Sequence, residues 1–315
     1  MTEMLALVDL GSNATRFVLA RINPGVEFRV LREERAQTRL AGGPRGRLSP
    51  EAVDETVAAV GAFLRRTRAI PDLRVNAIAT SAVRDAPNSC VLLAALRRRE
   101  DLDVRILAPA EEARLGALAA TWSLPLPTCL VFDLGGGSLQ LARADAGEIH
   151  PFGSFPLGAV RTTERFLRHD PPTSTEIATL RGEVWRLLLP VLERAEPQTP
   201  LVGLGGTART LARIYRDAGK LARASVHGLR LPRSEVTLVR ERLQALPTLD
   251  RQMPGLKPER ADILLAGAIV IEEVMALTRG DSVTVCDRSV RHGFLIHETF
   301  LRPRTSHTAA SLSRS

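Results

Sequence analysis

The chain has 315 residues, a hydrophobic fraction of 44% and a formal net charge of +8. This length and composition are typical of a globular protein with two domains, and no apolar run approaches the roughly 20 residues that cross a bilayer. The three cysteines form no CxxC pair and the six histidines form no HExxH pattern, which argues against a disulfide framework or a zinc site and leads us to expect a cytoplasmic protein with buried thiols.

The first part of the chain is predicted to be an antiparallel meander followed by alternating strands and helices. Ser49-Pro50-Glu51 is typical of a helix start, and Asn88 is a candidate N-cap. On the helix near 110, Leu115, Leu118, Ala119 and Trp122 form the predicted buried stripe. The predicted strands are 4–10, 16–22, 28–34, 74–79 and 104–107, and the later helices are 88–99 and 110–122.

Pro125 and Pro127 interrupt the chain before the same strand-turn-strand pattern restarts at 129–133. We therefore expect one domain at 1–126, a second at 127–301 and a disordered tail at 302–315, which has little apolar surface to bury. The remaining predicted strands are 139–143, 148–155, 201–204 and 281–286. The remaining predicted helices are 158–168, 173–195, one that begins after 205–207, 233–245, 258–278 and 288–300.

Two segments repeat one local design, in which an apolar strand ends in an aspartate and breaks into a Gly/Ser turn. They are Ala6–Asn13, with Asp9, and Leu130–Ser138, with Asp133. Glycine lets backbone N–H groups approach an anion closely, and a buried carboxylate needs a partner such as a metal ion. Two such turns facing each other would form a phosphate and metal cleft, with Mg²⁺ as the expected ion and Mn²⁺ as the alternative.

The candidate phosphate-binding residues come from these two turns and from a third turn between a strand and a helix. They are Gly11, Ser12, Asn13 and Arg16, then Gly135, Gly136, Gly137 and Ser138, then Gly205, Gly206 and Thr207.

Arg84 follows the strand 74–79 and lies at the edge of the sheet where ligands usually bind, so it is a further candidate for phosphate binding. Glu111 and Glu112 open the next helix. Helical geometry places Glu111 nearer the predicted apolar stripe and Glu112 at its edge, and periodicity alone does not choose between them.

With these residues identified, the chain resembles the exopolyphosphatase and guanosine pentaphosphate phosphohydrolase (Ppx/GppA) family of the actin-like and sugar-kinase ATPase superfamily. The resemblance covers about residues 4–300 and rests on eight segments in the family's order. They are Val8–Asn13, Thr80–Arg84, Glu111–Leu115, Phe132–Ser138, Phe155–Arg161, Gly203–Thr207, Glu259–Asp262 and Val290–Gly293.

The resemblance implies an α/β fold of two ribonuclease-H-like domains with an active-site cleft between them, in the two-domain core form. It also implies that Glu112 is the catalytic base and that Asp133 is the metal-linked aspartate. The repeated strand-acid-turn design itself predicts Asp9 as a second metal ligand, opposite Asp133 across the cleft. The family's GGGS-x-E pattern is broken here, because Gln140 stands where an acid is usual. Gln140 keeps an oxygen that can ligate a metal but loses a negative charge.

The expected activity is release of the terminal phosphate of inorganic polyphosphate by attack of water, with guanosine pentaphosphate as the alternative substrate. An actin-like or sugar kinase and a non-catalytic sensor of polyphosphate or guanosine tetraphosphate are the competing functions. Nucleic acid is not an expected partner, because only 4% of the residues are aromatic. No membrane association is expected. A homodimer is compatible with the resemblance, although the sequence defines no interface.

Overall fold

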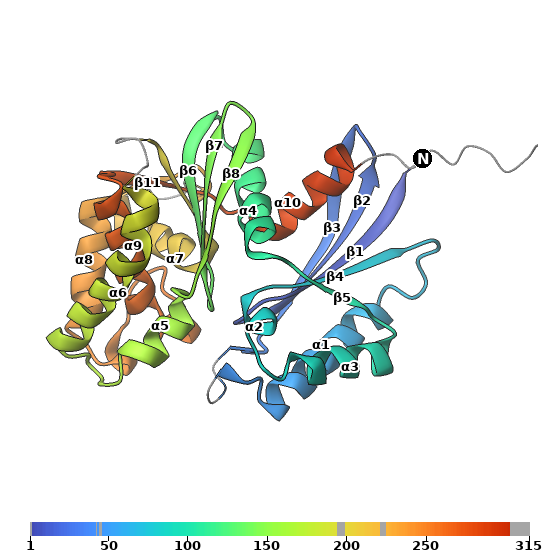
Figure 1. Cartoon of the computed structure of the whole chain (residues 1–315), viewed down its shortest axis with the longest axis horizontal. Helices are drawn as coiled ribbons and strands as arrows, with labels where there is room; N and C mark the ends of the chain where they lie inside the picture. Colours follow the sequence, from blue (N-terminus) through green and yellow to red (C-terminus); the bar gives the residue numbers. More distant parts are fainter. Residues whose placement is uncertain (1, 42, 44–45, 194–198, 221–224, 303–315) are drawn as a thin grey trace, which may run out of the picture.

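The computed structural model describes residues 2–41, 43, 46–193, 199–220 and 225–302. This part of the chain forms two mixed β-sheets, each with helices on both faces (Figure 1). From residue 303 onward, the tail expected at 302–315 lies outside the described residues. None of the described helices is long and apolar enough to cross a membrane.

The first sheet has the strand order β3-β2-β1-β4-β5. Its first three strands form the predicted antiparallel meander, and β4 and β5 run parallel to β1. The elements of this part are β1 (Glu3–Leu10), β2 (Thr15–Asn23), β3 (Glu27–Ala36), α1 (Pro50–Arg65), β4 (Arg74–Ala79), α2 (Ser81–Arg84), α3 (Ser89–Glu100), β5 (Val104–Ile106) and α4 (Pro109–Ser123).

The second sheet has the order β10-β11-β9-β6-β7-β8. Its strands and long helices are β6 (Thr128–Leu134), β7 (Leu139–Asp145), β8 (Glu148–Phe155), α5 (Ala159–Phe166), α6 (Ser174–Leu192), β9 (Leu201–Leu204), α7 (Gly205–Tyr215), β10 (Arg230–Pro232), α8 (Arg233–Gln244), α9 (Leu264–Leu277), β11 (Ser282–Val285) and α10 (Val290–Ile296). Short helical turns are η2 (Arg216–Lys220), η3 (Thr248–Asp250), η4 (Pro258–Arg260) and η5 (His297–Leu301).

The two sheets share one topology, because β6, β7 and β8 form an antiparallel meander and β9 and β11 run parallel to β6. The central strands β1 and β6 therefore occupy equivalent places. The strand order of the first sheet is that of a ribonuclease-H-like domain, and the second sheet repeats it with the additional edge strand β10. The predicted fold class is confirmed.

Each sheet is covered by outer helices on one face and by an inner helix on the other. Helices α1 and α3 pack on one face of the first sheet, and α6, α7, α8 and α9 share one hydrophobic core with a face of the second. Figure 1 shows α4 and α10 between the sheets. These inner helices are exchanged: α10 packs on the first sheet through Phe294 and Leu295, whereas α4 packs on the second through Ala113, Ala117 and Ala120.

The inner helices α4 and α10 cross in very close contact. A Cβ atom on Gly293 would lie 1.9 Å from the backbone oxygen of Leu115, so only glycine fits at this crossing. The small side chains of α4 and the glycine of α10 thus bring the two halves of the molecule together around their inner helices.

The structure differs from the predicted elements at a few places. The short elements α2 and β10 were not predicted, because four and three residues are too few to show a periodic pattern. The predicted helix 258–278 is divided into η4 and α9. The predicted N-cap of α1 is confirmed, because Ser49 accepts a hydrogen bond from the backbone N–H of Ala52.

Three side chains differ from the expectations. Trp122 is 54% exposed and stacks on Phe300, because the apolar contacts of α4 are made by its alanines instead. Asn88 is the N-cap residue of α3 as expected, but its side chain makes no capping hydrogen bond and its amide binds both backbone groups of Leu48 instead. Cys90 is exposed, whereas Cys129 and Cys286 are buried as expected.

Candidate active site

A cavity of about 110 Å³ lies where the carboxyl ends of the central strands of both sheets meet. Asp9 is the last residue but one of β1, and Asp133 holds the equivalent position in β6. Both side chains line the cavity, together with Glu112 from α4. The repeated strand-acid-turn design therefore places its two carboxylates at one site.

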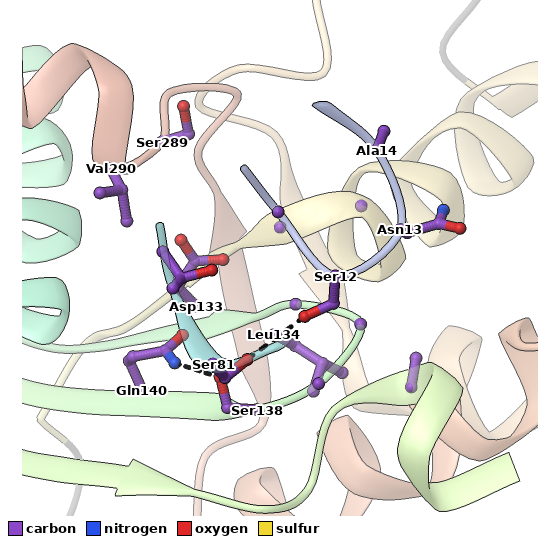
Figure 2. Close-up of a pocket in the computed structure, with 18 of the residues that line it drawn as sticks. Ser12, Asn13, Ala14, Ser81, Asp133, Leu134, Ser138, Gln140, Ser289 and Val290 are labelled. Atoms are coloured by element: carbon purple, nitrogen blue, oxygen red, sulfur yellow. Dashed lines mark hydrogen bonds between the residues drawn. The ribbon is translucent and has the colours of Figure 1, made fainter. Parts of the chain in front are cut away.

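The first two glycine turns face each other across this cavity and are in contact. A Cβ atom on Gly137 would lie 2.6 Å from the Ser81 Oγ and 2.7 Å from the Ser12 Oγ. These two serine hydroxyls are hydrogen bonded to each other at 3.2 Å, and Figure 2 shows them beside the turn that ends at Ser138. Glycine is required at position 137 because the facing turns leave no room for a side chain.

The backbone N–H groups of these turns are available to an anion. Within the described chain, the N–H groups of Ser12, Asn13, Gly136 and Gly137 have no hydrogen-bond acceptor. All four residues line the cavity. Four N–H donors that converge from two turns form the kind of concave site that binds phosphate oxygens.

The third turn adds the N-terminus of α7 to the cavity wall. Gly205 has φ = +96°, and a Cβ atom there would lie 2.2 Å from the backbone oxygen of Leu134, so a side chain is excluded. Gly205 and Gly206 line the cavity. Thr207 does not: it is completely buried, and its hydroxyl has no hydrogen-bond partner among the described residues.

Four arginines converge on the same cavity, namely Arg16, Arg209, Arg260 and Arg291. Burial, followed by repulsion from Arg291, lowers the pKa of Arg16 to about 9. Burial and Arg209 lower the pKa of Arg260 to about 10. The pKa of Arg209 is also lowered, again by burial first and Arg291 second. These buried guanidinium groups repel one another, so a bound polyanion would stabilise their charged forms.

Glu112 is the acid of α4 that points inward. Its side chain is buried and accepts a hydrogen bond from Arg84 Nη1 at 2.9 Å. Glu111 is partly exposed and forms an ion pair with Arg105 at 3.0 Å. The helical geometry that placed Glu111 nearer the apolar stripe was misleading, because α4 packs through its alanines rather than through Trp122.

Burial is the main cause of the perturbed acidity at this site. It raises the pKa of Glu112 to about 7, against the opposing effect of Arg84 and with a smaller contribution from Asp133 and Asp9. It also raises the pKa of Asp133 to about 6, although Arg209, Arg16 and Arg291 favour the charged form. A carboxyl group with a pKa near 7 suits a general base at neutral pH.

Arg84 and Gln140 are held in one hydrogen-bonded network. Gln140 Nε2 donates to the hydroxyls of Ser138 and Ser154, and Arg84 Nη2 donates to the same Ser154 hydroxyl at 3.4 Å. Figure 2 shows Gln140 and Asp133 pointing toward the pocket from neighbouring strands. Arg84, which was predicted to bind phosphate, does not line the cavity, and its Nη1 pairs with Glu112 at 2.9 Å.

The donors around Asp133 fit a magnesium ion that keeps water and phosphate ligands. Within the described part of the chain, the Asp133 carboxylate makes no hydrogen bond and no ion pair, yet it faces the cavity. Asp9 is already bound by Arg291 Nη1 at 3.0 Å. No three His, Cys, Asp or Glu side chains of the described residues form a ready metal cluster. Such a site matches Mg²⁺, which usually takes one or two carboxylates and substrate phosphates.

Sequence reasoning did not single out Arg209, Arg260, Arg291 and Ser289, which also line the cavity. A signal was present for two of them, because Arg260 and Arg291 lie in the segments Glu259–Asp262 and Val290–Gly293 that carry the resemblance. The positions of Arg260 and Arg291 at the cavity depend on how η4 and α10 pack. They could not be derived from local pattern.

Comparisons with known proteins agree with this geometry. The family model described as the Ppx/GppA phosphatase family matches residues 18–300. "Exopolyphosphatase 2" of Mycobacterium tuberculosis is 30% identical over 93% of this chain and 97% of its own length. "Exopolyphosphatase 1" of Mycobacterium leprae is 30% identical over 93% of this chain and 89% of its own length.

Solved structures show the same architecture. The crystal structure of the Aquifex aeolicus member of the Ppx/GppA protein family is 27% identical, with a TM-score of 0.79 over 95% of this chain and 98% of that one. An exopolyphosphatase from Cytophaga hutchinsonii, at 24% identity, shares the fold with a TM-score of 0.84 over 94% of this chain and 97% of that one.

Proposed function

The chain belongs to the Ppx/GppA phosphatase family, and from this premise we propose that it is an exopolyphosphatase that releases the terminal phosphate of inorganic polyphosphate by attack of water. The observation that carries this proposal is the cavity in which four arginines surround phosphate-sized turns and a buried glutamate. The mycobacterial relatives named exopolyphosphatases support the same activity class, a hydrolase of phosphoanhydride bonds.

In this mechanism Glu112 accepts the proton of the attacking water. Its burial keeps its pKa near 7, so that it is both available and basic enough at neutral pH. The free N–H groups of Ser12, Asn13, Gly136 and Gly137 bind the oxygens of the terminal phosphate, and the arginines balance the charge of the chain behind it.

A bound Mg²⁺ would be held by Asp133, with Asp9 and the side-chain oxygen of Gln140 nearby, and would neutralise charge on the transferred phosphoryl group. Mn²⁺ would be held by the same oxygen ligands. Gln140 is neutral and donates hydrogen bonds to Ser138 and Ser154. The negative charge of the cavity therefore comes from Asp9, Glu112 and Asp133.

Polyphosphate suits this cavity better than guanosine pentaphosphate. The described residues that line the cavity include no aromatic side chain on which a guanine could stack. Every unit of a polyphosphate chain can instead contact arginine, because its units are identical.

The decisive experiment compares phosphate release from long-chain polyphosphate, guanosine pentaphosphate and ATP, with Mg²⁺ and Mn²⁺ varied and E112Q as the inactive control. We expect the highest kcat/KM with polyphosphate and no need for an acceptor molecule. Transfer of phosphate to an added acceptor would favour a kinase instead. Tight binding of polyphosphate without any release of phosphate would identify a sensor and would exclude the enzyme.

A further inference from the structure

The guanidinium of Arg84 contacts several groups, and one of them is the proposed base Glu112. Nη1 lies 2.9 Å from Glu112 Oε2 and donates to the backbone oxygen of Leu107 at the same distance. Nη2 donates to Ser154 of the second sheet, and Nε lies 3.6 Å from Asp85 Oδ1. Arg84 therefore acts on Glu112 rather than on a ligand in the cavity.

Asp85 is shared by two arginines from different halves of the molecule. Its Oδ1 faces Arg84, the preceding residue, and its Oδ2 accepts a hydrogen bond from Arg161 Nη2 at 2.7 Å. Arg161 belongs to α5, and its backbone N–H donates to the Gly136 oxygen of the second glycine turn. Alternating charges thus connect Glu112, Arg84, Asp85 and Arg161 in one line from the buried base to the surface.

We propose that Asp85 is a positioning residue for Glu112, which it orients through Arg84, and that Arg161 completes this arrangement only when α2 and α5 are brought together. The proposal rests on the proposed function, in which Glu112 is the base. Arg161 binds both the second glycine turn and Asp85. One residue therefore fixes the position of that turn relative to Glu112.

The contact between Asp85 and Arg161 is better suited to positioning Glu112 than to stabilising the fold. The side chains of Asp85 and Arg161 are 42% and 32% exposed, and exposed ion pairs contribute little to the free energy of folding. The guanidinium of Arg84 is planar and contacts Asp85 through Nε and Glu112 through Nη1, so a displaced Asp85 would turn the group that holds Glu112. Small displacements of a catalytic group reduce the rate of the chemical step more than they reduce binding.

The test is steady-state hydrolysis of polyphosphate by D85N, R161Q and the double variant. We expect kcat to fall about three- to tenfold in each single variant, with KM changed less than twofold. The double variant should be no worse than either single one, because both changes break the same contact. D85E, which keeps the carboxylate, should recover most of the lost kcat.

The matched control is D281N, which removes an exposed aspartate that pairs with Arg230 at 3.1 Å, away from the cavity. Its kcat should equal that of the wild type. Additive losses in the double variant, or an unchanged kcat in D85N with intact polyphosphate hydrolysis, would overturn the inference while leaving the proposed function in place. Absence of hydrolysis by the wild type would refute the proposed function instead.

A second measurement requires no turnover. One spin label on the exposed Cys90 of α3 and another on R186C of α6 report the separation of the two halves. We expect a broader distance distribution in D85N and R161Q than in the wild type and D281N. Identical distributions in all four proteins would contradict the role given to the contact between α2 and α5.

Discussion

Replacing Glu112 by glutamine should make the protein more stable and much less active at the same time. The change keeps the size of the side chain and an oxygen that accepts from Arg84, but it removes a buried negative charge. Moving a carboxyl pKa from 4.5 to about 7 corresponds to about 3 kcal/mol at pH values above 7, at about 1.4 kcal/mol per pKa unit.

The sign of this effect follows from the raised pKa. Because the folded state favours the protonated form, the stabilising contribution of Glu112 is fully present below about pH 4.5 and is lost as the pH rises through about 7. E112Q stays neutral throughout. It should therefore equal the wild type near pH 4 and exceed its free energy of unfolding by about 2 to 3 kcal/mol at pH 8.

Urea unfolding at pH 4.5, 6 and 8 measures the stability difference, and phosphate release from polyphosphate measures the activity of the same samples. General-base catalysis contributes roughly 100- to 10,000-fold, so kcat of E112Q should fall by about that factor while polyphosphate binding is retained. E111Q is the matched control, since Glu111 is partly exposed and pairs with Arg105. A stability difference that does not grow with pH, or turnover close to the wild type, would refute this reasoning.

Three further predictions concern the same cavity. The kcat/KM of the wild type should rise with pH around a midpoint near 7, because Glu112 must be ionised to accept a proton; a flat profile between pH 6 and 8 would contradict its role. G137A should raise KM for polyphosphate by about tenfold, because the new Cβ would meet the hydroxyls of Ser81 and Ser12 and separate the glycine turns. An unchanged KM in steady-state kinetics would show that the turns tolerate a side chain at this position. D133N should weaken Mg²⁺ binding in the presence of phosphate by about tenfold or more, as measured by calorimetric titration, whereas equal affinity in the two proteins would remove Asp133 from the metal site.

The parts of the site that are local in sequence could be predicted from it. Strand, acid and glycine turn follow one another directly at Asp9 and again at Asp133, so their place at the strand ends follows from the pattern alone. The alternation of strands and helices then fixed the equivalent positions of the two central strands. These repeated elements predict two α/β units, and the ribonuclease-H-like class of both units was implied by the family resemblance.

The rest depended on how distant elements pack. The direction of Glu112 is set by the alanine face of α4, which rests on the second sheet and leaves Trp122 outside. Arg209 and Arg291 reach the cavity from helices that are far apart in sequence. Arg84 was expected to bind phosphate, but the partner of its guanidinium is the carboxylate of Glu112 in α4. No local sequence pattern could indicate this contact.

Because α4 and α10 are exchanged between the sheets, dividing the chain between residues 126 and 127 would separate each sheet from the helix that covers it. A polypeptide ending at residue 126 would lack α10 and expose the apolar face that Phe294 and Leu295 cover, and one beginning at residue 127 would lack the alanines of α4. Each fragment made alone would tend to aggregate through its bare sheet. When the two fragments are produced together, each supplies the helix that covers the sheet of the other, and we expect them to associate.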